Sequence, residues 1–173
     1  MSEPIVVHIK STVIDLILAQ KYRSEVTDGV FTDISGNMHS ENEIEEVCAD
    51  VYEYSAEGEL TVDEGTYTIR YNEPESVGMD NCETSIIVSE DSKETVTMSR
   101  TGSVSMACRF DSKDRRQLCC YETSVIPVEF FIQTRKVYHN IKSDGGSILL
   151  DYCIEIRGVN AERTKMFLEV YRR

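Results

Sequence analysis

The stretch of this sequence that looks most like a reactive site is residues 117–139, QLCCYETSVIPVEFFIQTRKVYH. Two adjacent cysteines precede an apolar run, and the stretch ends on His139. The whole chain has six cysteines and three histidines. A thiolate beside an imidazole can act as a nucleophile, and the same side chains bind zinc. Thiol catalysis and metal binding are therefore the chemistries that these residues suggest.

The spacing of the cysteines argues against both chemistries. Adjacent Cα atoms lie about 3.8 Å apart, which is shorter than the roughly 4.4–6.8 Å that disulfides span. On a strand, Cys119 and Cys120 also point to opposite faces. The other cysteines show neither a C-x-x-C pair nor a histidine at zinc-like spacing; they are Cys48, Cys82, Cys108 and Cys153. We expect free thiols that act as small hydrophobic residues, with no metal and no cofactor.

Other enzyme signatures are missing from the sequence. It has no phosphate-binding loop, no G-x-S-x-G and no H-E-x-x-H. The acidic run at residues 41–46 lacks the central glycine and the ligand spacing of a calcium loop. We interpret it as the solvated start of a short helix, in which Ser40 and Glu43 form a capping box. The sequence therefore favours a protein that is not an enzyme.

Arg100 is the residue whose position is most informative about a binding site. It alternates in phase with the apolar residues of its strand, which predicts that it points into the interior. A buried guanidinium needs a carboxylate partner, and Glu122 is one candidate. Alternatively, Arg100 anchors an anionic ligand group in an apolar pocket lined by Phe130, Ile132 and Tyr152. The sequence leaves both interpretations open.

Alternation with a period of two dominates from residue 50 onward and predicts antiparallel strands separated by short turns. In the strand that follows Pro127, inward parity holds through Thr134, whereas Val137 and Ile141 have the opposite parity. This change predicts a β-bulge between Thr134 and Val137.

We therefore predict an all-β fold, an antiparallel up-and-down barrel of about 8–10 strands, because closing the sheet buries one face of every strand and removes its edges. Residues 20–49 break the alternation and carry many polar residues. We expect them to form an irregular, partly helical and partly mobile excursion after the first strand, lying over one barrel end.

The length of 173 residues fits a single domain spanning residues 1–173. The net charge is −13, and residues 1–91 carry 21 acids against 4 bases. Such a charge repels nucleic acid and anionic lipid, so neither is expected as a partner. The amino-terminal residues lack the basic start and unbroken apolar stretch of a signal peptide. The sequence predicts a cytoplasmic protein; its oligomeric state stays open.

The order of motifs from residue 96 to 158 resembles the bacterial YwiB-like family of uncharacterised proteins. The resemblance rests on Arg100 and Gly102, on Tyr121 and Thr123 before the long apolar strand, and on the glycine pair 145–146. It implies a calycin-type, lipocalin-like barrel, with no activity attached.

The function that we expect is therefore binding of a small amphipathic or anionic ligand inside the barrel. The alternative is a protein–protein interaction module without a small-molecule site. The candidate ligand-binding residues of the barrel interior are Arg100, Tyr121, Phe130, Ile132, Thr134 and Tyr152.

Overall fold

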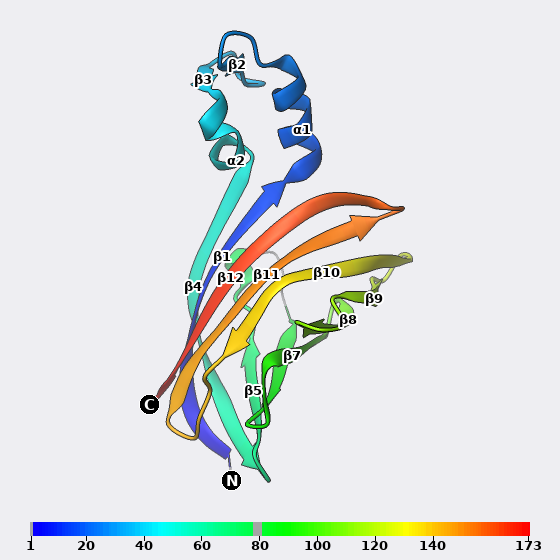
Figure 1. Cartoon of the computed structure of the whole chain (residues 1–173). Helices are drawn as coiled ribbons and strands as arrows, with labels where there is room; N and C mark the ends of the chain where they lie inside the picture. Colours follow the sequence, from blue (N-terminus) through cyan, green and yellow to red (C-terminus); the bar gives the residue numbers. More distant parts are fainter. Residues whose placement is uncertain (1, 78–80) are drawn as a thin grey trace.

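The computed structural model describes residues 2–77 and 81–173, and it contains a closed antiparallel β-barrel (Figure 1). Ten strands form the barrel: β1 (Ser2–Asp15), β4 (Ala49–Asp63), β5 (Thr66–Asn72), β6 (Glu83–Ser89), β7 (Ser92–Thr101), β8 (Ser105–Asp111), β9 (Arg116–Glu122), β10 (Pro127–His139), β11 (Gly145–Ile156) and β12 (Val159–Arg172). Each strand from β4 to β12 pairs with its neighbour in sequence, and β1 closes the barrel between β12 and β4. The predicted all-β, up-and-down barrel is confirmed.

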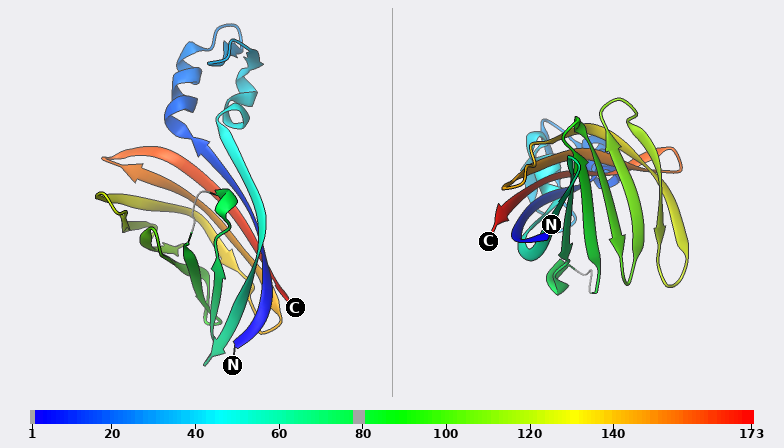
Figure 2. Two further views of the ribbon diagram at one scale, coloured as in Figure 1. Left: turned by 180° about the vertical axis from the view of Figure 1, so that it is seen from behind. Right: turned by 90° about the horizontal axis from the view of Figure 1, so that it is seen from below.

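Strand length divides the barrel into a long side and a short side. β1, β4, β10, β11 and β12 have 12 to 15 residues, whereas β5, β6, β8 and β9 have seven. In Figure 1 the long strands arch past the short ones. Both chain termini lie at the end of the barrel opposite to α1 and α2 (Figures 1 and 2).

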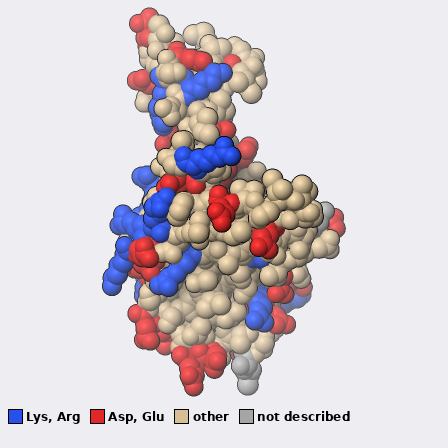
Figure 3. All heavy atoms as spheres, turned by 90° about the vertical axis from the view of Figure 1, so that its right-hand side faces the viewer, with Lys and Arg blue, Asp and Glu red and all other residues tan. Residues whose placement is uncertain are grey.

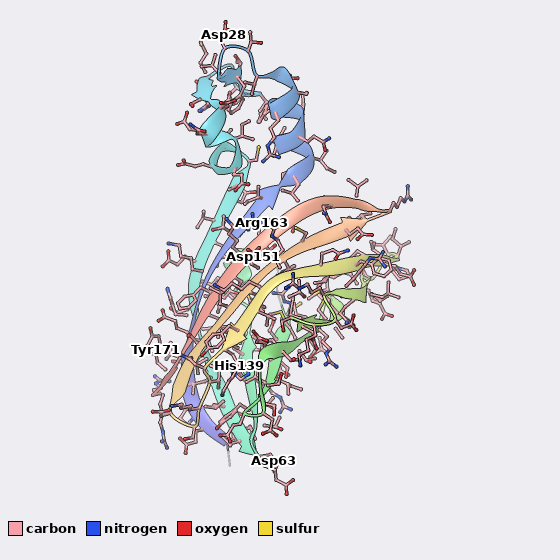
Figure 4. The ribbon with its side chains drawn as sticks, in the orientation of Figure 1. Asp28, Asp63, His139, Asp151, Arg163 and Tyr171 are labelled. Atoms are coloured by element: carbon pink, nitrogen blue, oxygen red, sulfur yellow. The ribbon has the colours of Figure 1, made fainter. Side chains whose placement is uncertain are left out.

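Alternate side chains of every barrel strand point inward and form one hydrophobic cluster. At the end that holds the termini, this cluster is tightly packed by aliphatic residues that are almost fully buried; they include Ile5, Val7, Leu60, Ile69, Ile86, Val96, Ile148, Leu150, Leu168 and Val170. On the outer face, Arg163 of β12 donates hydrogen bonds of 2.9 and 2.8 Å to the carboxylate of Asp151 on β11 (Figure 4).

The irregularity predicted in β10 is present. The register of β10 against β11 shifts between Thr134 and Lys136. Thr134 is buried before the shift, and Val137 and His139 are buried after it. The inward face therefore changes parity at this point, as the extra residue of a bulge requires.

The excursion after β1 contains more secondary structure, and begins earlier, than the sequence suggested. β1 ends at Asp15, and the next segment, residues 16–48, is here called the lobe. The lobe contains α1 (Leu16–Glu25), a hairpin of β2 (Val30–Thr32) and β3 (Met38–Ser40), a 3-10 turn η1 (Glu41–Glu43) and α2 (Ile44–Val47). The Glu43 carboxylate accepts a hydrogen bond from the Ser40 backbone N–H at 2.7 Å, as expected of a capping box.

Helix α1 was not predicted because its residues continue the apolar character of β1. Its start is fixed by Asp15, whose carboxylate accepts a hydrogen bond from the Leu18 backbone N–H at 2.8 Å. A separate hydrophobic cluster of Ile14, Ala19, Tyr22, Phe31, Ile44 and Cys48 holds the lobe together. Figure 1 shows the lobe standing beyond the barrel on the extended ends of β1 and β4.

Candidate functional site: a cavity in the barrel

The half of the barrel next to the lobe is hollow. A cavity of about 830 Å³ occupies it. Most of its wall is apolar, and its lining includes Ile9, Met98, Met106, Phe110, Phe130, Ile132, Ile154 and Met166. Ile17 and Cys48 of the lobe also line the cavity. The barrel is therefore a cup, packed at the end that holds the termini and hollow at the end next to the lobe.

A cluster of polar side chains interrupts the apolar wall around Glu73, which follows β5. The Glu73 side chain is 1% exposed. Its Oε2 accepts a hydrogen bond from the Tyr54 hydroxyl at 2.5 Å, and its Oε1 accepts one from the Thr84 hydroxyl at 2.6 Å. Arg100 Nε donates to the same Oε1 at 3.2 Å. Three donors, one of them the cationic Arg100, thus compensate the buried carboxylate.

The tyrosines of this cluster are held in their protonated, hydrogen-bond-donating form. Burial is the largest cause that raises the pKa of Tyr54, and neighbouring Tyr71 and Glu73 raise it further. Burial likewise raises the pKa of Tyr71, followed by the charge of Glu73. Burial is the largest single influence on Arg100 and acts to lower its pKa, but Glu73 and the neighbouring tyrosines together outweigh burial, so the pKa is raised. The cluster is therefore a neutral network of donors around one paired charge.

Arg100 has hydrogen-bonding capacity left over for a ligand. Its hydrogen bonds within the described residues run from Nε, to Glu73 and to Thr84. The side chain is 18% exposed and lines the cavity. A guanidinium carries five N–H donors. The terminal Nη atoms therefore have donors to offer to a group inside the cavity.

Five of the six residues expected in a binding site lie on the cavity wall. They are Arg100, Tyr121, Phe130, Ile132 and Tyr152. Thr134 is buried but does not line the cavity, and its hydroxyl has no hydrogen-bond partner in the described part of the chain. This happens because Thr134 lies deeper in the barrel than the hollow part, directly before the bulge of β10.

The prediction that Glu122 is the carboxylate partner of Arg100 is wrong. Glu122 is exposed on β9, whereas the ion pair forms with Glu73. Sequence reasoning missed Glu73 because it lies just beyond β5, before Pro74. The alternation did indicate that Glu73 points inward, because Glu73 continues the inward face of Ile69 and Tyr71.

The entrance of the cavity combines acidic and apolar side chains. Asp15 and Glu162 are directly opposite each other in the pairing of β1 with β12, and both line the cavity together with Asp50. Burial raises the pKa of Glu162, and the charge of Asp15 raises it further. An anionic ligand group is therefore disfavoured at this position.

Exposed aliphatic side chains lie on the turns at the same end of the barrel. Val125 and Ile126 lie between β9 and β10 and are 83% and 62% exposed. Val159 begins β12 and is 53% exposed. Figure 3 shows a broad area with few charged side chains below the lobe on the face toward which these hairpins point. Val128 and Ile156 line the cavity and are also 38% and 39% exposed, so apolar side chains continue from the cavity to the outside of the barrel.

The cysteines and histidines form no catalytic pair in the described structure. All six cysteines are free thiols, and five are buried, with Cys120 exposed. The histidine rings contact other groups: His8 contacts Ser55 and Glu53, His39 contacts Asp33, and buried His139 contacts the Ser92 carbonyl (Figure 4). Within residues 2–77 and 81–173, no cluster of histidine, cysteine and acidic side chains could hold a metal ion.

No helix in the described part of the chain is long and apolar enough to span a membrane.

The fold and the cavity define an antiparallel β-barrel protein with an internal cavity at one end. Residues 34–168 match a family described as a domain of unknown function, DUF1934, and the chain belongs to this family. The crystal structure of the ywiB protein from Bacillus subtilis is similar to this chain, with a TM-score of 0.67 at 20% identity. The match covers 99% of this chain and 93% of the ywiB chain. This likeness shows a shared fold, and the expected YwiB-like family is supported by it only together with the family match over residues 34–168. A search of curated proteins gave no match.

Proposed function

We propose that this protein binds a small amphipathic ligand inside the barrel, with the polar or anionic end of the ligand at Arg100. The observation that carries the proposal is the hollow half of the barrel. Its volume of about 830 Å³ falls within the roughly 300–1,000 Å³ typical of ligand pockets. A barrel filled by its own side chains, the usual state of a small barrel, would have no such space.

The distribution of polar groups supports one orientation of the ligand. Arg100 supplies from the wall terminal N–H donors that no residue in the described part of the chain accepts, whereas Asp15 and Glu162 make the entrance acidic. An anionic or hydrogen-bond-accepting group is therefore favoured next to Arg100. The apolar part of the ligand then contacts the methionine, isoleucine and phenylalanine side chains of the wall.

Two fluorescent dyes test the cavity and the role of Arg100 separately. Anilinonaphthalene sulfonate carries an anionic sulfonate, and N-phenyl-naphthylamine has the same aromatic rings without it. We expect both dyes to bind the protein. Replacing Ile154, which lines the cavity, with Trp should weaken both, because the larger side chain fills the space. Leu118→Trp is the matched control, since Leu118 is 59% exposed on β9 and does not line the cavity.

The charge of Arg100 is tested with Arg100→Met combined with Glu73→Gln, which removes the pair without leaving a buried charge unpaired. Loss of a charge-assisted hydrogen bond should weaken the sulfonate dye about tenfold or more. Binding of the uncharged dye should stay nearly unchanged. Binding of both dyes that is insensitive to Ile154→Trp would place them outside the cavity and contradict the proposal.

A second candidate function is docking of a protein partner by the lobe. It is supported by the exposed side chains of Ile34 and Met38 on the β2–β3 hairpin, which are 80% and 72% exposed. Capture of a partner from host extract by the full chain, lost on replacing both residues with Asp, would support it. Capture that is equal for the two proteins would count against this surface.

A further inference from the structure

Two cysteines lie at the place where strands β8 and β9 stop pairing. Over the described residues, the β8–β9 register contains the pairs Ser105↔Glu122 and Met106↔Tyr121, although each strand has seven residues. The same register continued by two residues places Cys108 opposite Cys119. The seam between β8 and β9 therefore has two thiols on its inward face, beyond the last paired residues.

The side chains of the two cysteines interact directly. Each thiol is the largest single influence on the pKa of the other, and Cys119 Sγ donates a hydrogen bond at 3.1 Å to the backbone carbonyl of Ala107, the residue before Cys108. Both residues are almost fully buried, at 4% and 2% exposure. Cys108 also lines the cavity, so a small solute that enters the cavity reaches the Cys108 side of this pair.

The geometry of opposite strand positions suits a disulfide. Disulfides span Cα atoms roughly 4.4–6.8 Å apart, close to the roughly 4.5–5.5 Å of paired antiparallel strands, and Cys108 and Cys119 lie only two positions beyond the last such pair. The adjacent pair Cys119 and Cys120 does not meet this condition. Of the other cysteines, Cys82 contacts the Ser103 hydroxyl, and Cys153 lies opposite Gln133 and Arg163 in the sheet.

We propose that Cys108 and Cys119 are a redox modification site that forms a cross-strand disulfide when a peroxide enters the barrel cavity. This inference is independent of the proposed ligand, because it needs only the cavity as a path for a small oxidant.

The reaction has two steps and consumes one hydrogen peroxide. The Cys119 thiolate attacks one peroxide oxygen, so that an S–O bond forms, the O–O bond breaks and water leaves after protonation. The Cys108 sulfur then attacks the sulfenic acid of Cys119, an S–S bond forms and the second water leaves. The two thiols lose two electrons together, and peroxide is reduced to two water molecules. The neighbouring Cys108 thiol lowers the pKa of Cys119, which favours Cys119 as the first nucleophile.

Trypsin separates the two cysteines, which makes the disulfide easy to detect. Cleavage after arginine places Cys108 in the peptide of residues 101–109 and Cys119 in that of residues 117–135. The experiment uses the full chain with Cys120→Ser, which removes the exposed thiol and leaves one cysteine in the second peptide. The reduced protein is treated with hydrogen peroxide, and the remaining thiols are alkylated in denaturant before digestion.

We expect the loss of two alkylatable thiols and a disulfide-linked pair of these peptides, reversed by dithiothreitol. Adding Cys119→Ser should abolish the link, whereas Cys153→Ser, the matched buried control, should leave it intact. The oxidised protein should also melt several degrees higher, because the cross-link constrains the unfolded chain. Full alkylation after peroxide treatment, a link between other cysteines, or sulfinic acid without the link would overturn the proposal.

Discussion

Removing either partner of the Glu73–Arg100 ion pair should destabilise the barrel, and the two losses should differ. Arg100→Met leaves the Glu73 carboxylate charged in a position that is 1% exposed. Breaking a buried ion pair in this way costs about 3–5 kcal/mol. Glu73→Gln instead leaves the guanidinium unpaired, but Arg100 is 18% exposed to the cavity, where water can solvate it. We therefore expect a smaller loss, about 2–3 kcal/mol.

The double variant should lose less stability than the sum of the single variants. With both charges removed, neither remains buried without a partner, and the coupling free energy should be about 2 kcal/mol. The assay is urea unfolding of the four proteins, followed by far-ultraviolet circular dichroism, with the slope of the free energy against urea required to stay constant. The control cycle uses Glu57 and Arg173, whose side chains are 73% and 61% exposed and should show no measurable coupling. Additive losses, or a larger loss for Glu73→Gln than for Arg100→Met, would refute this reasoning.

Three further predictions concern single residues. Thr134→Val should raise the free energy of unfolding by about 1 kcal/mol, measured in urea, because it removes a buried hydroxyl without a partner in the described chain. Hydrogen bonds from Asn37 and His39 lower the pKa of Asp33 to about 2, so nuclear magnetic resonance titration of its carboxyl carbon should show a midpoint near this value. Since this pKa is lowered, its contribution to lobe stability is complete above about pH 4 and is lost as the pH falls toward 2. Gly145→Ala should destabilise the barrel by about 1–3 kcal/mol in urea, because Gly145 has a φ of 119° and a Cβ would lie 2.2 Å from a backbone oxygen of β12.

Each of these predictions has a clear contrary result. A loss of stability in Thr134→Val would mean that the hydroxyl has a favourable interaction. An Asp33 midpoint near 4 would show that its hydrogen bonds do not persist in solution. Wild-type stability in Gly145→Ala would show that the β11–β12 pairing adjusts at this position.

The barrel could be predicted because its signal repeats in every strand. The alternation of residues 104–110 and 148–156 determines which side chains are inward, and the parity change after Thr134 locates the bulge of β10. The placement of Arg100 in the interior followed from the same rule.

The partner of Arg100 could not be chosen from strand parity. Glu122 and Glu73 both lie near strand ends, and the choice depends on which strands are neighbours and where a strand stops. β7 pairs with β6, and Thr84 of β6 lies opposite both Arg100 and Tyr71, which brings the end of β5 to Arg100. Such a contact follows from strand order and register together.

Neither the lobe nor the cavity could be predicted from the alternation of apolar residues, and the physical reason differs between the two. The hydrophobic cluster that holds the lobe together contains residues as far apart in sequence as Ile14, at the end of β1, and Cys48. No short sequence pattern predicts such a cluster. A cavity is set by how well side chains fill the interior of the barrel, and this depends on the size of all inward residues together. The alternation shows which residues line the interior but not whether they fill it.

The most direct test of the account is native mass spectrometry of the full chain purified from its own host. The account predicts a fraction of the protein with a bound small molecule, whose mass is lost in Ile154→Trp and kept in Leu118→Trp. A single mass equal to that of the bare chain, together with no binding of either naphthalene dye, would contradict the claim that the barrel is a ligand-binding cup.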